Sequence, residues 1–302
     1  MKYVIGMVLL VVAAGFVFRN DINQLLIADS FATASAKEEK KKEGKKGEGK
    51  KEKTPQDAAV QLEQQWTLPP VLREVSGIAY MDKDRFACIQ DEDGVIYIYN
   101  RAEDEIEKEI PFAGPGDYEG IALNEGTAYV VRADGQLYEV PLDRGQKGVK
   151  TFRTPLTEAH NVEGLFYDKG GNRLLLAIKD DEPHTKAYKG IYAFDLGSNT
   201  FVENPVFKIN LKDPVLQQSG GKKEKAIKPS EVAIHPVTGE IYITDGPAAR
   251  LLVLHANGNA KRLYHLGNDF PQAEGIAFSP DGTLFISNEG KERGNIIQVA
   301  LQ

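Results

Sequence analysis

The chain has 302 residues, with 37 Lys and Arg against 44 Asp and Glu, a formal net charge of −7 and one cysteine. Residues 1–36 sum to zero and residues 37–53 carry +4, so residues 54–302 carry −11, an acidic balance that argues against nucleic acid as a partner. A single cysteine excludes an intrachain disulfide and a Cys-based metal cluster, and we assign Cys88 to the core because its neighbours are apolar.

Residues 1–20 are predicted to be a membrane anchor or a signal segment. Lys2 precedes an unbroken apolar run of 16 residues, 3–18. This run is shorter than the roughly 20 residues that span a bilayer, but it is at the long end for the core of a signal peptide. Ala-x-Ala cleavage sequences begin only at Ala32. We therefore favour an uncleaved anchor with Lys2 in the cytoplasm, and late cleavage is the alternative.

Residues 21–60 are predicted to be a disordered Lys/Glu-rich tether. Within them, residues 37–53 contain nine Lys, five Glu, three Gly and nothing apolar that could be buried. The charge of +4 could attract anionic lipid headgroups or an acidic partner, but we interpret the segment as a solvated spacer.

Residues 61–302 contain a repeat that predicts an all-β domain. Each unit opens at a glutamate, and the five glutamates are Glu74, Glu119, Glu163, Glu231 and Glu274, at spacings of 45, 44, 68 and 43 residues. A four-stranded propeller blade takes roughly 40–50 residues, so the third unit carries insertions. Short alternating strands between Asp-Gly, Asn-Gly and Gly-Gly turns indicate antiparallel meanders. We predict a β-propeller of five four-stranded blades; six blades would need a degenerate blade within residues 200–228.

The last unit reaches Gln302 without a fourth strand. The segment Trp66-Thr67-Leu68 lies just before the first unit and is predicted to supply that strand. The N-terminal strand would then close the ring with the C-terminal blade and leave no open edge. The small residues that follow the glutamates are explained by crowding of the innermost strands near the axis.

Two sets of polar residues are predicted to converge on one face, because the start of the first strand and the end of the second lie together in a hairpin. The first set is the five glutamates. The second set is Gln90, Arg132, Lys179, Asp245 and Asn288, with Asp91 and Glu289 just beyond. The long insertions, residues 180–189 and 212–228, fall on the same face, which is typical of a binding face.

Five carboxylates around a narrow axis repel by roughly 2 to 3 kcal/mol per neighbouring pair, at about 6 Å and an effective dielectric of 20. With Asp245 they sum to −6, against +2 from Arg132 and Lys179. We therefore predict a divalent cation, calcium in preference to magnesium, held by the five glutamates and Asp245. Protonation of some glutamates is one alternative. The other is that they accept backbone N–H bonds from the next blade and tie the ring together.

Several strings within residues 66–302 carry a family resemblance: Glu74–Tyr80, Gln90–Gly94, Asp117–Ala122, Asn161–Leu165 and Arg173–Ala177. Through these strings the sequence resembles the SdiA-regulated, or YjiK-like, family of membrane-tethered bacterial propellers. The resemblance implies a propeller attached to the cytoplasmic membrane and calcium binding, and it brings no established reaction. The basic tether is not part of the family pattern.

A looser similarity is to gluconolactonase-like and phytase-like propellers. In that interpretation Glu74 or Glu274, Asn288 and Asp245 would hold a metal that polarises a carbonyl or phosphoryl oxygen.

The leading hypothesis is an anchored, monomeric extracytoplasmic propeller that binds a divalent cation and a small-molecule or cell-envelope ligand at the acidic mouth of its channel. The ligand would contact Gln90, Asp91, Arg132, Lys179, Asn288 and Glu289. A metal-dependent lactonase, esterase or phosphoesterase is the alternative, and a pure interaction scaffold comes third.

Overall fold

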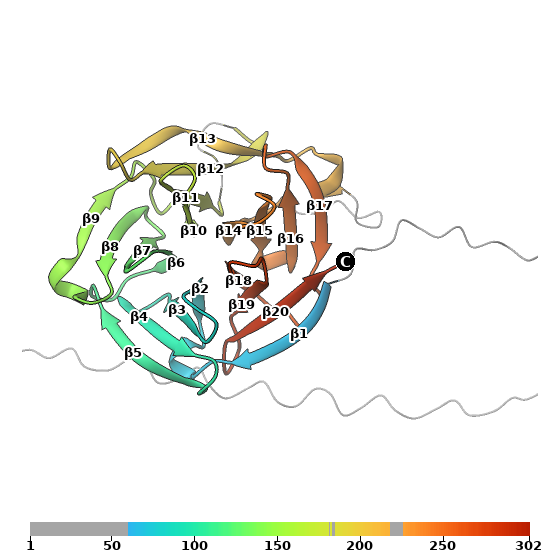
Figure 1. Ribbon diagram of the computed structural model, residues 1–302. Coiled ribbons are helices and arrows are strands. Elements are labelled where there is room, and N and C mark those ends of the chain that lie inside the picture. Colours follow the sequence, from blue (N-terminus) through green and yellow to red (C-terminus); the bar gives the residue numbers. More distant parts are fainter. Residues whose placement is uncertain (1–59, 181, 183–184, 218–225) are drawn as a thin grey trace, which may run out of the picture. The chain divides into compact units, whose positions relative to one another are not determined.

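The computed structural model of the chain describes residues 60–180, 182, 185–217 and 226–302. These residues form five four-stranded antiparallel sheets, which stand as blades around a common centre (Figure 1). The predicted five-bladed propeller is therefore confirmed. The anchor, residues 1–20, and residues 21–59 of the tether lie outside the described part of the chain. Within that part, no helix has the length and apolar character needed to cross a membrane.

The blades follow one another along the chain. In blades 1 to 4 the strands run in sequence order from the innermost to the outermost, whereas the outermost strand of blade 5 is the N-terminal strand β1. Blade 1 consists of β2 Val75–Tyr80, β3 Arg85–Gln90, β4 Val95–Asn100 and β5 Glu105–Pro111. Blade 2 consists of β6 Tyr118–Asn124, β7 Thr127–Arg132, β8 Gln136–Pro141 and β9 Lys150–Arg153. Blade 3 consists of β10 Val162–Asp168, β11 Arg173–Ile178, β12 Tyr188–Asp195 and β13 Thr200–Asn210. Blade 4 consists of β14 Glu231–Ile234, β15 Ile241–Asp245, β16 Arg250–Leu254 and β17 Ala260–His265. Blade 5 consists of β18 Ala273–Phe278, β19 Leu284–Asn288, β20 Asn295–Leu301 and the N-terminal strand β1 Val60–Thr67. Four short 3₁₀ turns are also described, at Pro70–Leu72, Gly145–Gly148, Pro214–Gln217 and Gly246–Ala248.

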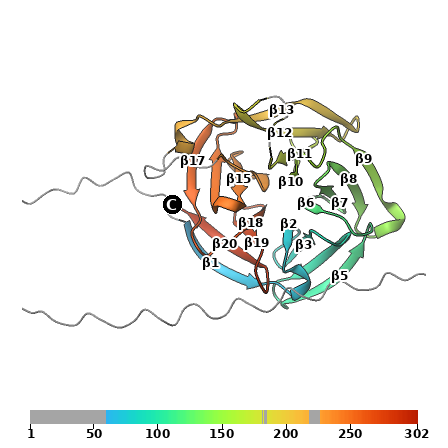
Figure 2. The ribbon, with the colours of Figure 1, turned by 180° about the vertical axis from the view of Figure 1, so that it is seen from behind.

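The ring closes as predicted, by pairing of the N-terminal strand with the C-terminal blade. Strand β1 runs antiparallel to β20, from Val60 opposite Leu301 to Thr67 opposite Asn295, and both views show the two strands side by side (Figures 1 and 2). The ring of Trp66 lies 4.7 Å from the guanidinium carbon of Arg101 in blade 1. Since β1 covers the edge of β20 and contacts the next blade, it joins the two ends of the ring.

The hydrophobic core lies between the blades. Five clusters of buried side chains each draw on two neighbouring blades, and the cluster between blades 5 and 1 contains Cys88, which is fully buried as predicted. In that cluster Phe86 and Phe285 meet edge to face, with ring centroids 5.1 Å apart. Burying one side chain of this size contributes roughly 1.5 to 3 kcal/mol, so contacts between blades hold the ring rigid around its centre.

The innermost strands approach one another too closely for side chains at certain positions. A Cβ on Gly120 would lie 2.7 Å from the carbonyl oxygen of Glu163, and one on Gly164 would lie 2.9 Å from the Cα of Glu231. Glycine is required at these two positions because neighbouring backbones pack directly against them. The predicted crowding near the axis is thereby confirmed.

Candidate functional site

The pairing register of the inner hairpins corrects the equivalence of the five glutamates. In blade 2, Tyr118 pairs with Arg132 and Gly120 with Val131, so Glu119 is the extra residue of a β-bulge. Glu163 has the same place in blade 3, and in blade 5 the register shift includes Glu274. In blade 1, however, the extra residue is Ser76 rather than Glu74. Only three of the five glutamates therefore occupy equivalent positions.

Glu74 lies two residues before the bulge, at the position that Asp117 has in blade 2. Its side chain is 37% exposed and forms an ion pair with Arg73 at 2.6 Å. Glu231 differs in another way, because it lies at the glycine position of the motif and strand β14 pairs with β15 without a shift. Sequence spacing predicted that Glu74 and Glu231 are equivalent to the other three glutamates. The pairing register shows that they are not.

Glu231 has the bridging role that was the alternative to metal binding. Its side chain is buried, and one carboxylate oxygen accepts hydrogen bonds from the backbone N–H of Leu165, at 2.7 Å, and of Val232, at 2.8 Å. Leu165 belongs to blade 3 and Glu231 to blade 4, so this carboxylate ties two blades together. Burial raises the pKa of Glu231 well above its ordinary value, and the two N–H groups oppose the rise.

The three equivalent residues Glu119, Glu163 and Glu274 are called the central carboxylates below. Glu163 is the best defined, with a side chain that is only 4% exposed. Its Oε1 accepts hydrogen bonds from Lys179 Nζ at 2.8 Å and from Asn161 Nδ2 at 2.9 Å. Its Oε2 is buried and has no hydrogen-bond partner within the described residues. One strong acceptor in the group therefore has no donor among the described residues.

The central carboxylates act on one another electrostatically. Burial, with the charges of Glu163 and Asp117 next, raises the pKa of Glu119 to about 10. Burial also raises the pKa of Glu163 to about 8, although Lys179 opposes the rise. The pKa of Glu274 is raised as well, chiefly by burial, and again Lys179 opposes. Buried carboxyls that shift in this way without a cation hold protons near neutral pH.

Lys179 brings a positive charge to this arrangement. Burial lowers its pKa, but the Glu163 carboxylate, with Glu274 and Glu119 behind it, raises it further, and the net change is a rise. Lys179 therefore stays charged and partly neutralises the central carboxylates.

The register also corrects the second predicted set. Tyr118 pairs with Arg132, whereas Val162 pairs with Ile178, so Lys179 lies one position beyond the equivalent of Arg132. The residues equivalent to Lys179 are Asp91, Ala133, Gly246 and Glu289. Successive side chains of a strand point to opposite faces, so the predicted second set mixes two orientations.

The four remaining members of the second set bond within their own blades. Arg132 forms a two-point ion pair with Asp134, at 2.6 and 2.9 Å. Gln90 donates to Asp93 at 2.8 Å, and Asn288 donates to Asn295 at 2.9 Å. Arg132 was counted as a possible internal partner of the glutamates, but its guanidinium group pairs instead with Asp134, two residues away.

Asp245 has an internal cation that the sequence analysis missed. Arg250 donates from Nε to Asp245 Oδ2 at 3.0 Å, and the two side chains are 4% and 1% exposed. The two residues face each other across the turn between β15 and β16. The sequence did contain a signal for this ion pair: a basic residue, Arg250, begins the third strand of the blade, and an acidic residue, Asp245, ends the second strand.

A further acidic patch lies where blades 5 and 1 meet. Gln272 Nε2 donates to Glu289 at 2.6 Å. Burial, with the charges of Glu274 and Asp91 next, raises the pKa of Glu289 to about 7. Asp91 Oδ1 and Asn288 Oδ1 are buried and have no hydrogen-bond partner among the described residues. Gln272 was not among the predicted residues, although it lies just before Glu274.

The described residues contain no group of three or more His, Cys, Asp or Glu side chains that is arranged to hold a metal ion. Of the central carboxylates, Glu163 bonds to Lys179, and Glu274 and Glu119 interact with its charge. The described parts of the two long insertions include an ion pair of 3.0 Å between Lys228 and Asp180.

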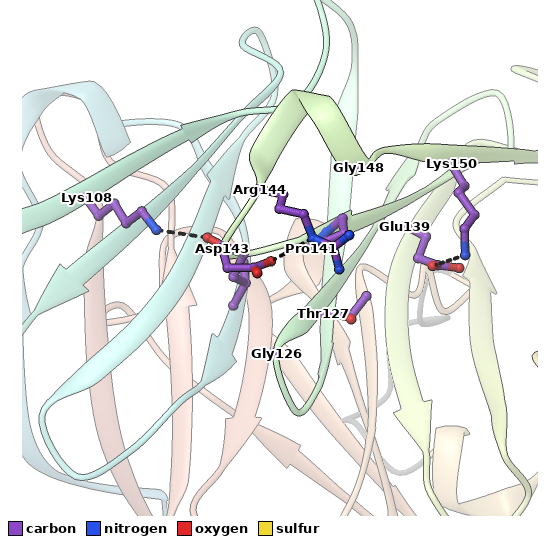
Figure 3. A pocket seen from close by; sticks show the side chains of 10 residues that line it. Lys108, Gly126, Thr127, Glu139, Pro141, Asp143, Arg144, Gly148 and Lys150 are labelled. Atoms are coloured by element: carbon purple, nitrogen blue, oxygen red, sulfur yellow. Dashed lines mark hydrogen bonds and ion pairs between the residues drawn. The ribbon is translucent and has the colours of Figure 1, made fainter.

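The hollow in Figure 3 lies away from these groups, on the outer part of blades 1 and 2, and has a volume of about 650 Å³. Its lining includes the start of β7, which is the end of blade 2 opposite the bulges. Lys150 pairs with Glu139 at 2.7 Å, and Arg144 pairs with Asp143 at 3.4 Å. Lys108 donates to the carbonyl oxygen of Leu142 at 2.9 Å. Because these charged groups already have partners in ion pairs or at a backbone carbonyl, the hollow is the weaker candidate.

Comparison with known proteins gives a family and a fold. A family model described as SdiA-regulated matches residues 50–291. No curated protein matches the sequence. Among solved structures, the glutaminyl cyclase of Myxococcus xanthus superposes with a TM-score of 0.57 at 14% identity, covering 82% of this chain and 99% of that chain. Virginiamycin B lyase from Staphylococcus aureus has a TM-score of 0.44 at 13% identity, covering 81% and 74%. At these identities the structural likeness concerns the fold alone.

Proposed function

The chain belongs to the SdiA-regulated family, and we propose that its propeller is a membrane-anchored, extracytoplasmic binding protein that takes up a divalent cation, calcium, at the central carboxylates. A small-molecule or cell-envelope ligand would bind beside this cation. The anchor and its orientation are inferred from Lys2 and the apolar run of residues 3–18.

The observation that carries the proposal is the unpartnered Oε2 of Glu163. This oxygen is buried, and it belongs to a group of three carboxylates on the inner strands β6, β10 and β18, which Lys179 only partly neutralises. An acceptor in that setting costs roughly 1 to 3 kcal/mol when it is left unsatisfied, more when it is charged. A cation that binds there would remove this cost and the mutual repulsion of the carboxylates.

The donor chemistry favours calcium. All the candidate ligands are oxygen atoms, which select hard cations over zinc. Calcium accepts six to eight oxygens in flexible geometry, whereas magnesium requires near-ideal octahedral geometry. Because Glu163 must exchange its bond to Lys179 for a bond to the cation, the site suits the more flexible ion.

The proposed ligand set is narrower than the predicted one. Glu119, Glu163 and Glu274 would hold the cation. Glu231 and Asp245 are engaged by backbone N–H groups and by Arg250, so they are assigned to the frame of the ring.

The residues proposed to contact the second ligand are those at the position of Lys179, namely Lys179, Asp91 and Glu289. Gln90, Arg132 and Asn288 are less suited to it, since each bonds within its own blade.

The test is calcium binding by the full chain in mild detergent, measured by calorimetry, with thermal melting in EDTA and in calcium. At a calcium concentration of 100 times Kd, linkage predicts about 2.7 kcal/mol of stabilisation. Glu163→Gln should weaken binding at least about tenfold. Glu103→Gln, an exposed carboxylate in a blade 1 turn, is the matched control and should leave binding unchanged. Absence of calcium binding by the unaltered chain would refute the proposal.

A metal-dependent hydrolase is the second candidate. It is favoured by Glu289, which Gln272 orients at 2.6 Å and whose pKa of about 7 suits a general acid or base. Turnover of lactones or phosphoesters that a chelator abolishes, and that Glu289→Gln suppresses, would establish it. Calcium binding without such turnover would leave the binding protein as the assignment.

A further inference from the structure

Lys179 is held at its backbone by hydrogen bonds, whereas its ammonium group bonds to a side chain, the Glu163 carboxylate. Its N–H donates to the carbonyl oxygen of Asn161 at 2.9 Å, and its own carbonyl oxygen accepts from Lys189 Nζ at 2.9 Å. The side chain is 20% exposed, whereas its partner Glu163 is 4% exposed. The ammonium group can therefore move toward solvent while the backbone remains in place.

The fold does not require a lysine at this position. The equivalent residues of the other blades are Asp91, Ala133, Gly246 and Glu289, two acidic residues and two of the smallest. Ala133 and Gly246 show that the inner hairpin forms without a long side chain here. Lys179 therefore contributes positive charge near the central carboxylates and is not needed for the packing of blade 3.

We propose, on the basis of the proposed function, that Lys179 is an internal counter-cation. It competes with the bound cation and sets the charge preference of the site. Its ammonium group occupies Glu163 Oε1 while no other cation is bound, and it leaves that oxygen when one binds. Once cation binding has released their protons, the three central carboxylates carry −3, and the nearby charge of Lys179 reduces the total to −2, which matches a divalent ion. Without Lys179 the charge of −3 would favour a trivalent ion.

The experiment compares Lys179→Met with the unaltered chain, both as full chains in mild detergent, by calorimetric titration with calcium and with terbium(III). Methionine keeps an unbranched side chain and removes the charge. Calcium should bind at least about tenfold more tightly to the variant, which corresponds to about 1.4 kcal/mol. The terbium-to-calcium affinity ratio should also rise at least about tenfold, a change that an altered packing alone would not produce.

Two control variants accompany the titration. Lys179→Arg keeps the charge and should leave the terbium-to-calcium ratio unchanged. Lys83→Met removes a lysine that is 85% exposed and should change neither affinity. If Lys179→Met does not fold, Lys179→Ala replaces it, because alanine is the residue of blade 2 at this position.

The outcomes separate the two proposals. If neither the unaltered chain nor the variant binds calcium, the proposed function fails, and this inference fails with it. If the unaltered chain binds calcium and Lys179→Met binds it equally or more weakly, the internal counter-cation is refuted while the proposed function stands. Tighter calcium binding with an unchanged terbium-to-calcium ratio would refute the charge preference.

Discussion

Replacing Asp245 by Asn should destabilise the propeller strongly and leave cation binding intact. Asn keeps the shape of the side chain and removes the charge that faces Arg250, and the two side chains are 1% and 4% exposed. Burial raises the pKa of Asp245, but the guanidinium group opposes the rise and holds the pair together. Removing one partner of a buried ion pair costs about 3 to 5 kcal/mol, because the other charge remains buried without compensation. For a domain of this size that loss lowers Tm by about 6 to 20 °C.

Urea unfolding of the full chain in detergent measures the loss, and calorimetry measures calcium affinity of the folded variant. Asp143→Asn is the matched control, because Asp143 pairs with Arg144 at 3.4 Å with both side chains mostly exposed. Its cost should be less than about 1 kcal/mol. Calcium affinity of Asp245→Asn should stay within about twofold, since Asp245 is assigned to the frame and not to the cation. A loss of stability no larger than that of the control, or a calcium affinity lowered tenfold or more, would refute this reasoning.

Two further predictions concern pH and ring closure. Burial raises the pKa of Glu119 to about 10 and of Glu163 to about 8, from an ordinary value of 4.5, so the folded protein keeps protons that the unfolded chain releases. Without calcium, the free energy of unfolding should therefore fall between about pH 5 and pH 8, and Glu163→Gln should flatten that fall in urea titrations; a stability that rises with pH over this range would contradict it. Deleting residues 1–67, compared with a deletion that ends before Val60, should expose the edge of β20 and cause aggregation in light scattering, because β1 pairs along β20 from Val60 to Thr67. Equal solubility of the two truncated chains would argue against the closing role of β1.

The blade count was predictable because it depends on local order, and the closing strand followed from that count although β1 pairs with β20 at the other end of the chain. The Asp-Gly, Asn-Gly and Gly-Gly turns join strands that are neighbours in the sequence, and antiparallel hairpins fold from adjacent segments. The spacing of the glutamates therefore counted the blades, and the missing fourth strand at Gln302 identified Trp66-Thr67-Leu68 as its replacement. In the structure the strand begins at Val60, the last residue of the predicted tether, and ends at Thr67, so Leu68 lies just beyond it.

The polar site was less predictable, because it depends on contacts between residues that the repeat does not relate. Arg250 and Asp134 lie outside the repeated motif. Arg250 forms an ion pair with Asp245, and Asp134 forms one with Arg132. Sequence spacing counted those charges as available at the axis. Only the paired positions of β15 with β16, and the turn after β7, show that they are already compensated.

The amino-acid sequence by itself determined the acidic all-β domain, its five blades and the glutamate-rich inner strands, since hydrophobic alternation and turn residues specify local strand order. Tertiary structure alone decided which glutamates are equivalent. A β-bulge at Glu119 and Glu163 inserts one residue into each inner strand, whereas Glu231 lies in a strand that pairs without a shift. Because side chains alternate with a period of two, a shift of one residue changes the face to which a carboxylate points, and spacing of about 44 residues cannot reveal it.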